Sequence, residues 1–276
     1  MNRWISPLLI LACLVSASAC RPTPEHYTEF ETRVVDPMDA RSARIQVDHG
    51  EVVILEAEDS RVRVEGQVLF EDELEYSVSS TEKQVSIKVF AHRQSSSKAP
   101  LHVMIRLPRP MQARVETESA SVLAQGIQGD VEVVSTSGDI TLEQITGRMT
   151  LQSNRGNIII RESSGTISVV GNYGGLKIQN VHGETAASTI MGNVVFDGLI
   201  ATGDTIRLET DHGGVSVNLS ADSALTLHVS STSGDVTCML PDVVSSTRTC
   251  DGKIHSGDGN LSVRTVSGAV TLQLIP

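Results

Sequence analysis

The four cysteines have the most distinctive chemistry in this chain, because a thiol can be acylated, oxidised or bound to a metal. Cys13 and Cys20 lie in the apolar N-terminal segment, whereas Cys238 and Cys250 lie twelve residues apart near the other end. In an oxidising compartment, Cys238 and Cys250 are predicted to form a disulfide that closes a loop through Pro241. The alternative is two unpaired thiols. Neither residue has a neighbouring His or a Cys-x-x-Cys spacing that would indicate a metal site.

Residues 1–19 are predicted to be an export signal, with Arg3 ahead of an apolar stretch that ends in small residues. A transmembrane helix would need ~20 apolar residues, and this stretch is shorter. The letters ASA before Cys20 resemble the bacterial lipobox. That resemblance implies that Cys20 is acylated and becomes the first residue of the mature chain. The alternative is an ordinary signal peptide cleaved after residue 19.

Residues 20–33 are predicted to be the lipidated Cys20 followed by a flexible tether, because this stretch has prolines and no periodic apolar pattern. The likeness to sorted lipoproteins implies a lipid-anchored protein of the bacterial cell envelope. Arg21, in place of the Asp associated with inner-membrane retention, implies the outer membrane where the cell has one.

The charge of the chain excludes one large class of partner. Without residues 1–19 the chain has 21 basic and 33 acidic residues, a net charge of −12. Nucleic-acid binders need a basic face that displaces counterions, so no nucleic acid is expected as a partner.

Acidic residues beside glycines are the next candidates for chemistry, since β-helices often carry polysaccharide lyases and hydrolases. At such positions Asp is more often a turn former than half of a catalytic pair. From residue 113 onward only Tyr173 and Phe196 are aromatic, which is few for a sugar-binding platform. We therefore predict no catalytic residues and no enzymatic activity. The aspartates concerned are Asp130, Asp139, Asp204 and Asp235.

Two further patterns could indicate a metal site or a serine nucleophile, but each has a simpler explanation. Asp251, His255 and Asp258 could form a metal site, but their spacing fits neither an EF-hand nor a zinc motif, so a solvated loop is predicted. Ser137 and Ser233 precede glycines without the Gly-x-Ser-x-Gly elbow of a nucleophile. We expect turn residues there, and no metal or cofactor.

Glycine recurs every nine residues over much of the chain, and this repeat must position whatever surface the protein uses. Two and four residues after each glycine the side chains are mainly apolar, which is the period of a strand with one buried face. The glycines of the repeat are Gly129, Gly138, Gly147, Gly156, Gly165, Gly174, Gly183 and Gly192.

The repeats alternate between two types, so the structural unit is predicted to have 18 residues and two strands. One type has Ser or Thr three residues before the glycine, as at Ser135 and Gly138, and the other has an aliphatic residue two before it, as at Ile145 and Gly147. An 18-residue coil that returns in register stacks strands of one type on each other. The fold class is therefore all-β, a β-solenoid.

The predicted divisions are a signal peptide at 1–19, a tether at 20–33, a less regular N-terminal β region or cap at 34–110, and solenoid repeats at 111–276. A terminal cap is expected because an open ladder of strands invites end-to-end pairing. The longer interval between Gly234 and Gly259, which contains Cys238 and Cys250, is predicted to be an excursion from the stack.

The chain resembles the bacterial putative-adhesin family of β-strand-repeat envelope proteins, a domain of unknown function. The resemblance rests on the lipobox-like start, on the similar units at 135–142 and 231–238, and on the final VSGAVTL. It implies a β-helix-like fold and an envelope or surface location, and it supplies no catalytic residues.

Together these observations predict a lipid-anchored, non-enzymatic scaffold that contacts an envelope or surface protein or a glycan. Exposed side chains that alternate with the core, such as Thr150, Gln152, Lys177 and Gln179, would form its contact face. Two alternatives stay open. One is an enzyme that acts on envelope polysaccharides, and the other is a structural or stress-related envelope component without an external ligand.

Overall fold

The computed structural model describes residues 27–68, 74–91 and 101–275. These residues form 25 strands and no helix, which confirms the predicted all-β class. The predicted signal peptide and Cys20 lie outside the described residues. A search of the described part of the chain finds no helix long and apolar enough to cross a membrane.

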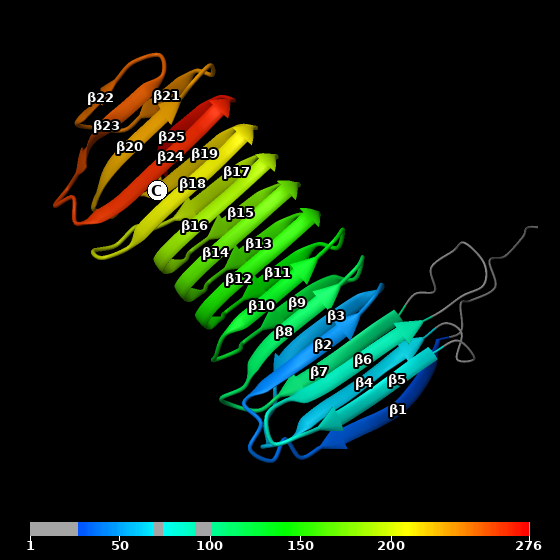
Figure 1. Ribbon diagram of the computed structural model, residues 1–276. Coiled ribbons are helices and arrows are strands. Elements are labelled where there is room, and N and C mark those ends of the chain that lie inside the picture. The colour runs from blue at the N-terminus through cyan, green and yellow to red at the C-terminus, as the bar shows by residue number, and fades with distance from the viewer. Residues whose placement is uncertain (1–26, 69–73, 92–100, 276) are drawn as a thin grey trace, which may run out of the picture.

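The strands form two long sheets that face each other (Figure 1). The first, sheet A, has twelve strands. In spatial order they are β1 (Thr28–Val35), β4 (Val62–Val68), β7 (Leu101–Leu107), β3 (Glu51–Glu56), β9 (Ser121–Gln125), β11 (Ile140–Glu143), β13 (Ile158–Arg161), β15 (Leu176–Gln179), β17 (Val194–Gly198), β19 (Val215–Ser220), β25 (Val270–Ile275) and β21 (Val236–Met239).

The second sheet, sheet B, has thirteen strands. From the N-terminal end of the stack they are β5 (Leu74–Ser80), β6 (Val85–Ala91), β2 (Ser42–Val47), β8 (Gln112–Thr117), β10 (Val131–Ser135), β12 (Thr146–Arg155), β14 (Ser164–Tyr173), β16 (His182–Met191), β18 (Thr205–His212), β24 (Gly259–Ser267), β20 (Leu225–Ser231), β23 (Thr249–Ile254) and β22 (Val243–Ser245).

The central strands pair in parallel with a shift of 18 residues, as the glycine repeat predicts. Val131 of β10 pairs with Met149 of β12, and Met149 pairs with Ile167 of β14. In sheet A the same shift joins Ile140 to Ile158. Each coil therefore contributes one strand to each sheet, which confirms the solenoid of 18-residue, two-strand coils.

The core is a thin layer of aliphatic side chains between the two sheets. Alternate residues of each strand are buried, for example Ile140 and Leu142 in β11. Phe196 is the largest fully buried side chain, and β16 of the same coil contributes the small residues Thr185 and Ala187 to the interior. A core of this kind grows by stacking coils, so it needs few aromatic residues.

Each coil turns at two corners of different character. We call the turn from sheet B to sheet A the polar corner, because its inward column consists of hydroxyl residues apart from Gly171. We call the return turn the aliphatic corner, since Ile127, Ile145, Val181 and Ile200 are buried there, although two coils have the buried Ser163 and Ser223 instead. The buried hydroxyl residues of the polar corner are Thr117, Ser135, Ser153, Thr189, Thr210, Thr265 and Ser231.

The N-terminal end is closed by antiparallel strands, as expected for a cap. Strands β1 and β4 extend sheet A, and β5 extends sheet B. The rings of Phe30 and Tyr76 lie 4.7 Å apart between these edges, and the Tyr76 hydroxyl donates to the Val64 carbonyl at 3.3 Å. Burial raises the pKa of Tyr76 to about 12, because desolvation disfavours the phenolate.

Two details of the N-terminal half differ from the sequence analysis. The predicted tether of 20–33 overlaps β1, which begins at Thr28 and has one buried anchor, Phe30. A single anchor among exposed polar residues produces no periodic pattern. The parallel pairing also crosses residue 110, because β2 and β3 of the predicted cap pair in register with β8 and β9.

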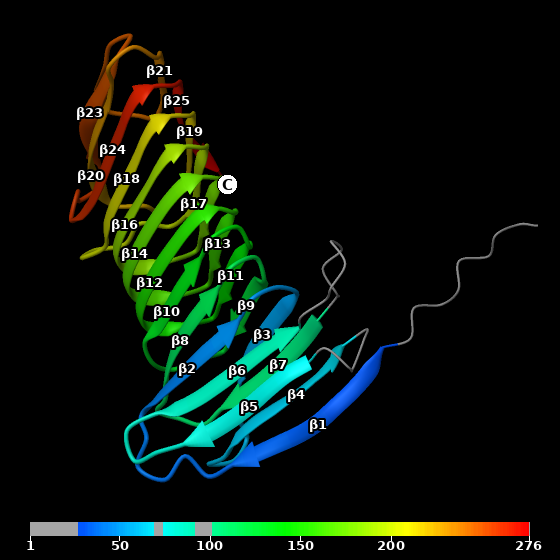
Figure 2. The same ribbon diagram turned by 45° about the vertical axis from the view of Figure 1, so that its right-hand side comes forward.

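The coils at both ends are out of sequence order. Strands β2 and β3 lie inside β6 and β7, next to the central coils. At the other end β24 and β25 lie between the coil of β18 and β19 and the coil of β20 and β21 (Figure 2). The excursion between Gly234 and Gly259 includes β22 and β23, which cover the edge of sheet B. The glycine spacing carried no signal of this exchange.

Candidate interaction surface

The structure joins Cys238 of β21 to Cys250 of β23 by a disulfide, with their Cα atoms 6.4 Å apart. Because β21 belongs to sheet A and β23 to sheet B, the bond links the two sheets at the C-terminal end. The pair lies within the predicted excursion and closes a loop through Pro241. The lipidation candidate, Cys20, lies outside the described residues.

The aspartates beside glycines hold neighbouring coils together. Asp139 accepts a hydrogen bond from the backbone amide of Asn157 at 2.7 Å, and Asp130 accepts one from Arg148 at 3.1 Å. The buried Asp204 accepts from the amides of Gly183 and Ala201 at 2.7 and 2.9 Å. These are turn carboxylates, but most of the bonds reach the adjacent coil, which a local sequence reading could not predict.

The other candidates for chemistry make similar structural contacts. His255 contacts the Ser223 carbonyl at 2.8 Å through Nδ1, and Asp251 contacts His228. Ser137 and Ser233 donate to carbonyls of neighbouring coils at 3.1 and 2.9 Å. Within the described ranges no three His, Cys, Asp or Glu side chains gather as metal ligands.

One of the two outward columns of sheet A is a ladder of long polar side chains that bond from coil to coil, and the other column has Thr141, Ile159, Lys177 and Val195. Arg161 donates to Glu143 at 2.9 Å and to Gln179 at 3.2 Å. The series continues from Gln179 to Asp197 at 3.0 Å, and on through Asn218 to Gln273. Since these groups satisfy one another, a partner at this face would have to displace them.

The outer face of sheet B is different, because two adjacent columns at its centre have uncharged side chains that are short except for Gln152. We call this region the panel and define it as Thr150, Gln152, Ser168, Val170, Ala186 and Ser188, which lie on β12, β14 and β16. Nearby apolar residues at the end of these strands are also exposed. Tyr173, Ile190 and Met191 expose 54%, 46% and 49% of their surface, which is a feature of interaction sites.

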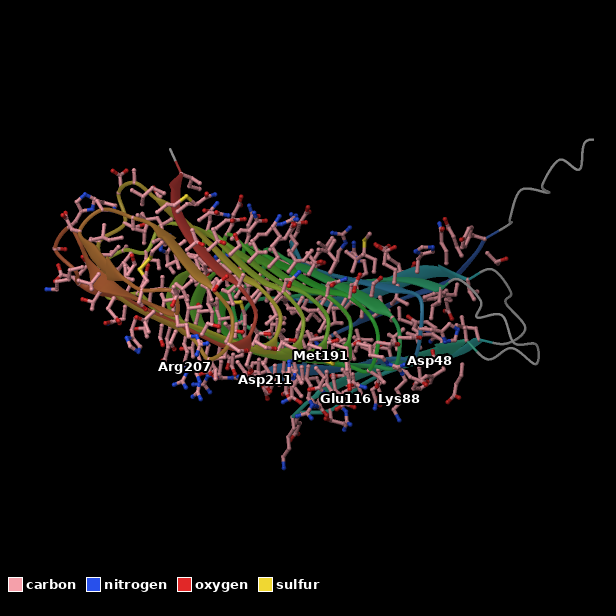
Figure 3. The ribbon with its side chains drawn as sticks, turned by 90° about the horizontal axis from the view of Figure 1, so that it is seen from above. Asp48, Lys88, Glu116, Met191, Arg207 and Asp211 are labelled. Atoms are coloured by element: carbon pink, nitrogen blue, oxygen red, sulfur yellow. A yellow bond between two sulfur atoms is a disulfide. The ribbon has the colours of Figure 1, made fainter. Side chains whose placement is uncertain are left out.

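Charged residues flank the panel at both ends. On the N-terminal side Arg114 contacts Glu116 and Glu132 at 3.1 and 3.2 Å. On the C-terminal side Arg207 contacts Glu209 at 2.7 Å. Figure 3 shows that Lys88, Glu116, Met191 and Arg207 lie along the same long side of the molecule.

Glu116 is the most strongly held of these acids. Hydrogen bonds from Arg44 at 2.8 Å, from Arg114 at 3.1 Å and from Gln46 at 3.0 Å keep the pKa of its carboxyl below the usual range. The carboxylate is therefore charged at neutral pH, and the flank of the panel has a fixed arrangement of charges.

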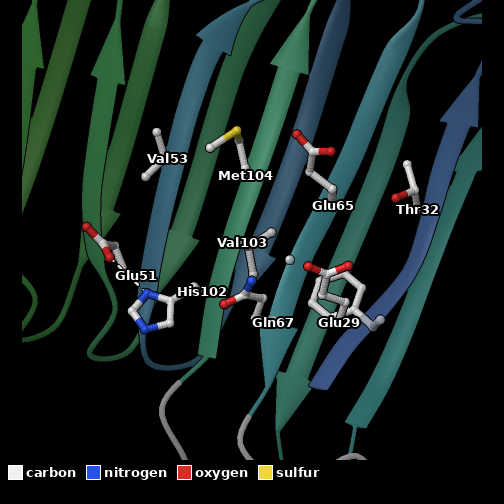
Figure 4. A pocket seen from close by; sticks show the side chains of 11 residues that line it. Glu29, Thr32, Glu51, Val53, Glu65, Gln67, His102, Val103 and Met104 are labelled. Atoms are coloured by element: carbon white, nitrogen blue, oxygen red, sulfur yellow. Dashed lines mark hydrogen bonds and ion pairs between the residues drawn. The ribbon is translucent and has the colours of Figure 1, made fainter. Parts of the chain in front are cut away.

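A hollow of about 400 Å³ opens on sheet A at the N-terminal end, over β1, β4, β7 and β3 (Figure 4). Val53 and Met104 line it together with the carboxylates of Glu29, Glu51 and Glu65. His102 contacts Glu51 at 2.9 Å across one side. The sequence analysis missed this hollow, because its residues come from strands that are far apart in the sequence.

Two solved structures align with most of this chain at low sequence identity. A putative adhesin from Bacteroides fragilis is 12% identical, with a TM-score of 0.52 over 90% of this chain and 99% of its own. A putative adhesin from Parabacteroides distasonis is 10% identical, with a TM-score of 0.42 over 90% and 98%. At these identities the first structure supports the fold alone. No curated protein matches the chain.

The family comparison covers most of the chain. The model of the Toastrack DUF4097 family matches residues 38–273, which extend from just after β1 into β25. The match includes the cap strands β4 and β5, the central coils and the exchanged coil at the C-terminal end. The resemblance stated from the sequence motifs is thus confirmed, and the chain belongs to the Toastrack DUF4097 family.

Proposed function

We propose that this protein is a lipid-anchored, non-enzymatic scaffold of the bacterial cell envelope, which contacts a surface or envelope protein or a glycan. The observation that carries the proposal is the contrast between the two outer faces. Sheet A has a ladder of long polar side chains bonded to one another along one outward column, whereas the panel on sheet B has uncharged, mostly short side chains beside exposed Tyr173, Ile190 and Met191. The adhesin-like fold of the relatives agrees with this use of a long rigid body.

The predicted lipid anchor at Cys20 would hold the protein at a membrane surface. A signal of residues 1–19 followed by an acylated Cys20 would hold the chain at the envelope, in the outer membrane of a cell that has one. The acidic body would resist collapse onto anionic lipid headgroups. The test is labelling of cells with a radioactive fatty acid. Wild type should be labelled and Cys20→Ala should not, and label that persists in Cys20→Ala would overturn the anchor.

The interaction role has a separate test. A photo-crosslinking amino acid is placed in the panel at Ala186, or on the ladder face at Lys177 as a control, in the full chain in intact cells. We expect more adducts from position 186. Equal adducts from both positions would overturn the assignment of the panel. Turnover of peptidoglycan or polysaccharide fragments by the purified protein would instead support the enzymatic alternative.

A further inference from the structure

The charges that flank the panel are arranged symmetrically about one strand. A column here is the set of residues that pair side by side across successive strands of a sheet. Glu132 and Arg207 lie in one column of sheet B, two strands before and two strands after β14. Strand spacing of about 4.8 Å separates them by about 19 Å. Between them the column contains only the uncharged Thr150, Ser168 and Ala186.

The neighbouring column has the same centre. Glu116 lies three strands before β14, and Arg264 lies three strands after it. At this centre the column contains Val170, which exposes 46% of its surface. Two columns with different spacings thus place an acid and a base at equal distances on opposite sides of β14.

The net charges of the two flanks follow the same pattern. Within these two columns, β8 and β10 have one arginine and two glutamates, a net charge of −1, and β18 and β24 have two arginines and one glutamate, a net charge of +1. Arg44, which contacts Glu116, lies on the next strand, β2, outside this count. Arg264 makes no ion pair with any described residue. The first group is Arg114, Glu116 and Glu132, and the second is Arg207, Glu209 and Arg264.

A surface with this arrangement is complementary to itself. In a two-fold dimer the same patch is used on both copies, and residue i of one copy contacts residue j of the other. Rotation about an axis along β14 reverses the order of the strands and keeps each column in place. Glu132 would then face Arg207 of the second copy, and Glu116 would face Arg264.

The centre of the face also suits such a pairing. On the axis, Ser168 and Val170 would each meet the same residue of the second copy, and the exposed ring of Tyr173 lies at the end of the same strand. Short side chains allow two sheets to approach closely, because sheets pack face to face at about 10 Å. The ladder of long side chains on sheet A offers no such flat area.

We propose that the occupant of the panel is a second copy of this chain, bound face to face with its coils in reverse order. This inference rests on the proposed function, since it names the partner of the same surface. The seven strands from β8 to β24 give a footprint on the order of 600 Å². Stable interfaces bury roughly 600–1,000 Å² per partner, so this footprint lies at the low end of that range. Confinement by the predicted lipid anchors would raise the effective concentration of the two copies.

The test uses disulfide trapping of the full chain in its native membrane. Ser168→Cys lies on the proposed axis, so two copies should form a disulfide-linked dimer when a mild oxidant is added. The matched control is Ser262→Cys, an exposed serine in the same column and three strands from β14. Two copies of residue 262 would lie about 29 Å apart, which is too far for a bond.

We expect about tenfold more dimer from Ser168→Cys than from the control. Reversing one charge in the Ser168→Cys background, with either Glu132→Arg or Arg207→Glu, should reduce the dimer, and the two changes together should restore it. Failure of the combined variant to recover the dimer would overturn the proposed register.

Other outcomes separate the two proposals. If Ser168→Cys is trapped on other envelope proteins and not on itself, self-pairing is wrong while the scaffold function is supported. If it forms no more adducts of any kind than Ser262→Cys, both the pairing and the assignment of the panel are overturned.

Discussion

The two corners of each coil make the same reversal with different interiors. At the polar corner the Ser135 hydroxyl accepts from the amide of Gly138 at 2.8 Å and donates to its carbonyl. At the aliphatic corner Ile145 fills the same space with a side chain that is fully buried. At these two positions the polar corner is closed by hydrogen bonds, and the aliphatic corner is closed by packing together with the bond from the Ile145 amide to the Ser163 hydroxyl at 3.1 Å.

Glycine is also required at the two corners for different reasons. Gly138 lies so close to the coil below that an added Cβ would meet the Ala120 carbonyl oxygen at 1.8 Å. Gly147 also approaches the coil below, since an added Cβ would meet the Gly129 carbonyl oxygen at 2.5 Å, and in addition it has a positive φ of 149°. The difference teaches that one periodic residue can mark a steric requirement alone at one turn, and a steric and a conformational requirement together at the next.

The largest effect should come from filling the close approach at the polar corner. Gly138→Ala is expected to lower the free energy of unfolding by about 4 kcal/mol or more, because backbone cannot move aside as a flexible side chain does. Denaturant unfolding measures the change. The control is Gly175→Ala, where the nearest atom is 3.4 Å from the added Cβ, and it should be nearly neutral. Equal losses in both variants would contradict the steric explanation.

The next effect tests packing at the aliphatic corner. Ile145→Ala should cost about 2–4 kcal/mol, since it removes buried methyl groups from a site that cannot collapse fully. The thermal midpoint and the denaturant midpoint should both fall. Ile145→Val is the matched control and should cost about 1 kcal/mol. A cost of Ile145→Ala no larger than that of Ile145→Val would show that the corner is not held by packing.

A smaller loss is expected from the hydroxyl of the polar corner. Ser135→Ala leaves the buried amide of Gly138 without its acceptor, at a cost of about 1–2 kcal/mol. Ser135→Thr keeps the hydroxyl, as Thr117 does in the coil below, where it accepts from Ala120 at 2.8 Å. Ser135→Thr should therefore stay near wild type in the same unfolding experiment. If both variants lose the same stability, the hydrogen bond is not the cause.

The smallest effect should come from the exposed bond between coils at the polar corner. Asp139→Ala removes the acceptor for the amide of Asn157 and should cost about 0.5–1 kcal/mol. Asp139→Asn retains an acceptor oxygen and should cost less. Hydrogen exchange of the Asn157 amide gives a local measure, because protection should fall in Asp139→Ala. Unchanged protection would contradict the assigned bond.

The repeat in the sequence predicted the coils because each signal is local. A glycine every nine residues and apolar residues two and four positions later specify corners and buried faces, and the structure has both at Gly138, Ile140 and Leu142. The exchange of coils at the ends could not be predicted, since β18 and β20 have equally suitable edges for β24. Pairing partners that lie 55 and 34 residues apart leave no periodic trace.

The surface was only partly predictable for a similar reason. Alternation identified Thr150, Gln152, Lys177 and Gln179 as outward residues, and all four are outward on the two sheets. It did not distinguish the panel from the ladder, because bonds such as Arg161 to Glu143 connect residues 18 apart across coils. The charge symmetry about β14 also requires the full strand order, which the sequence alone does not supply.

The place of the last coil has a consequence for the order in which the chain can fold. A chain that emerges N-terminus first delivers β20 to β23 before β24 and β25. Yet β21 pairs with β25 alone among the described strands, and β20 reaches the central stack only through β24. The segment from β20 to β23 must therefore wait, partly unpaired, until the final residues arrive. The order of synthesis and the order of assembly are opposed at this end, and a chain cut short before residue 259 would leave two open edges for other chains to pair with.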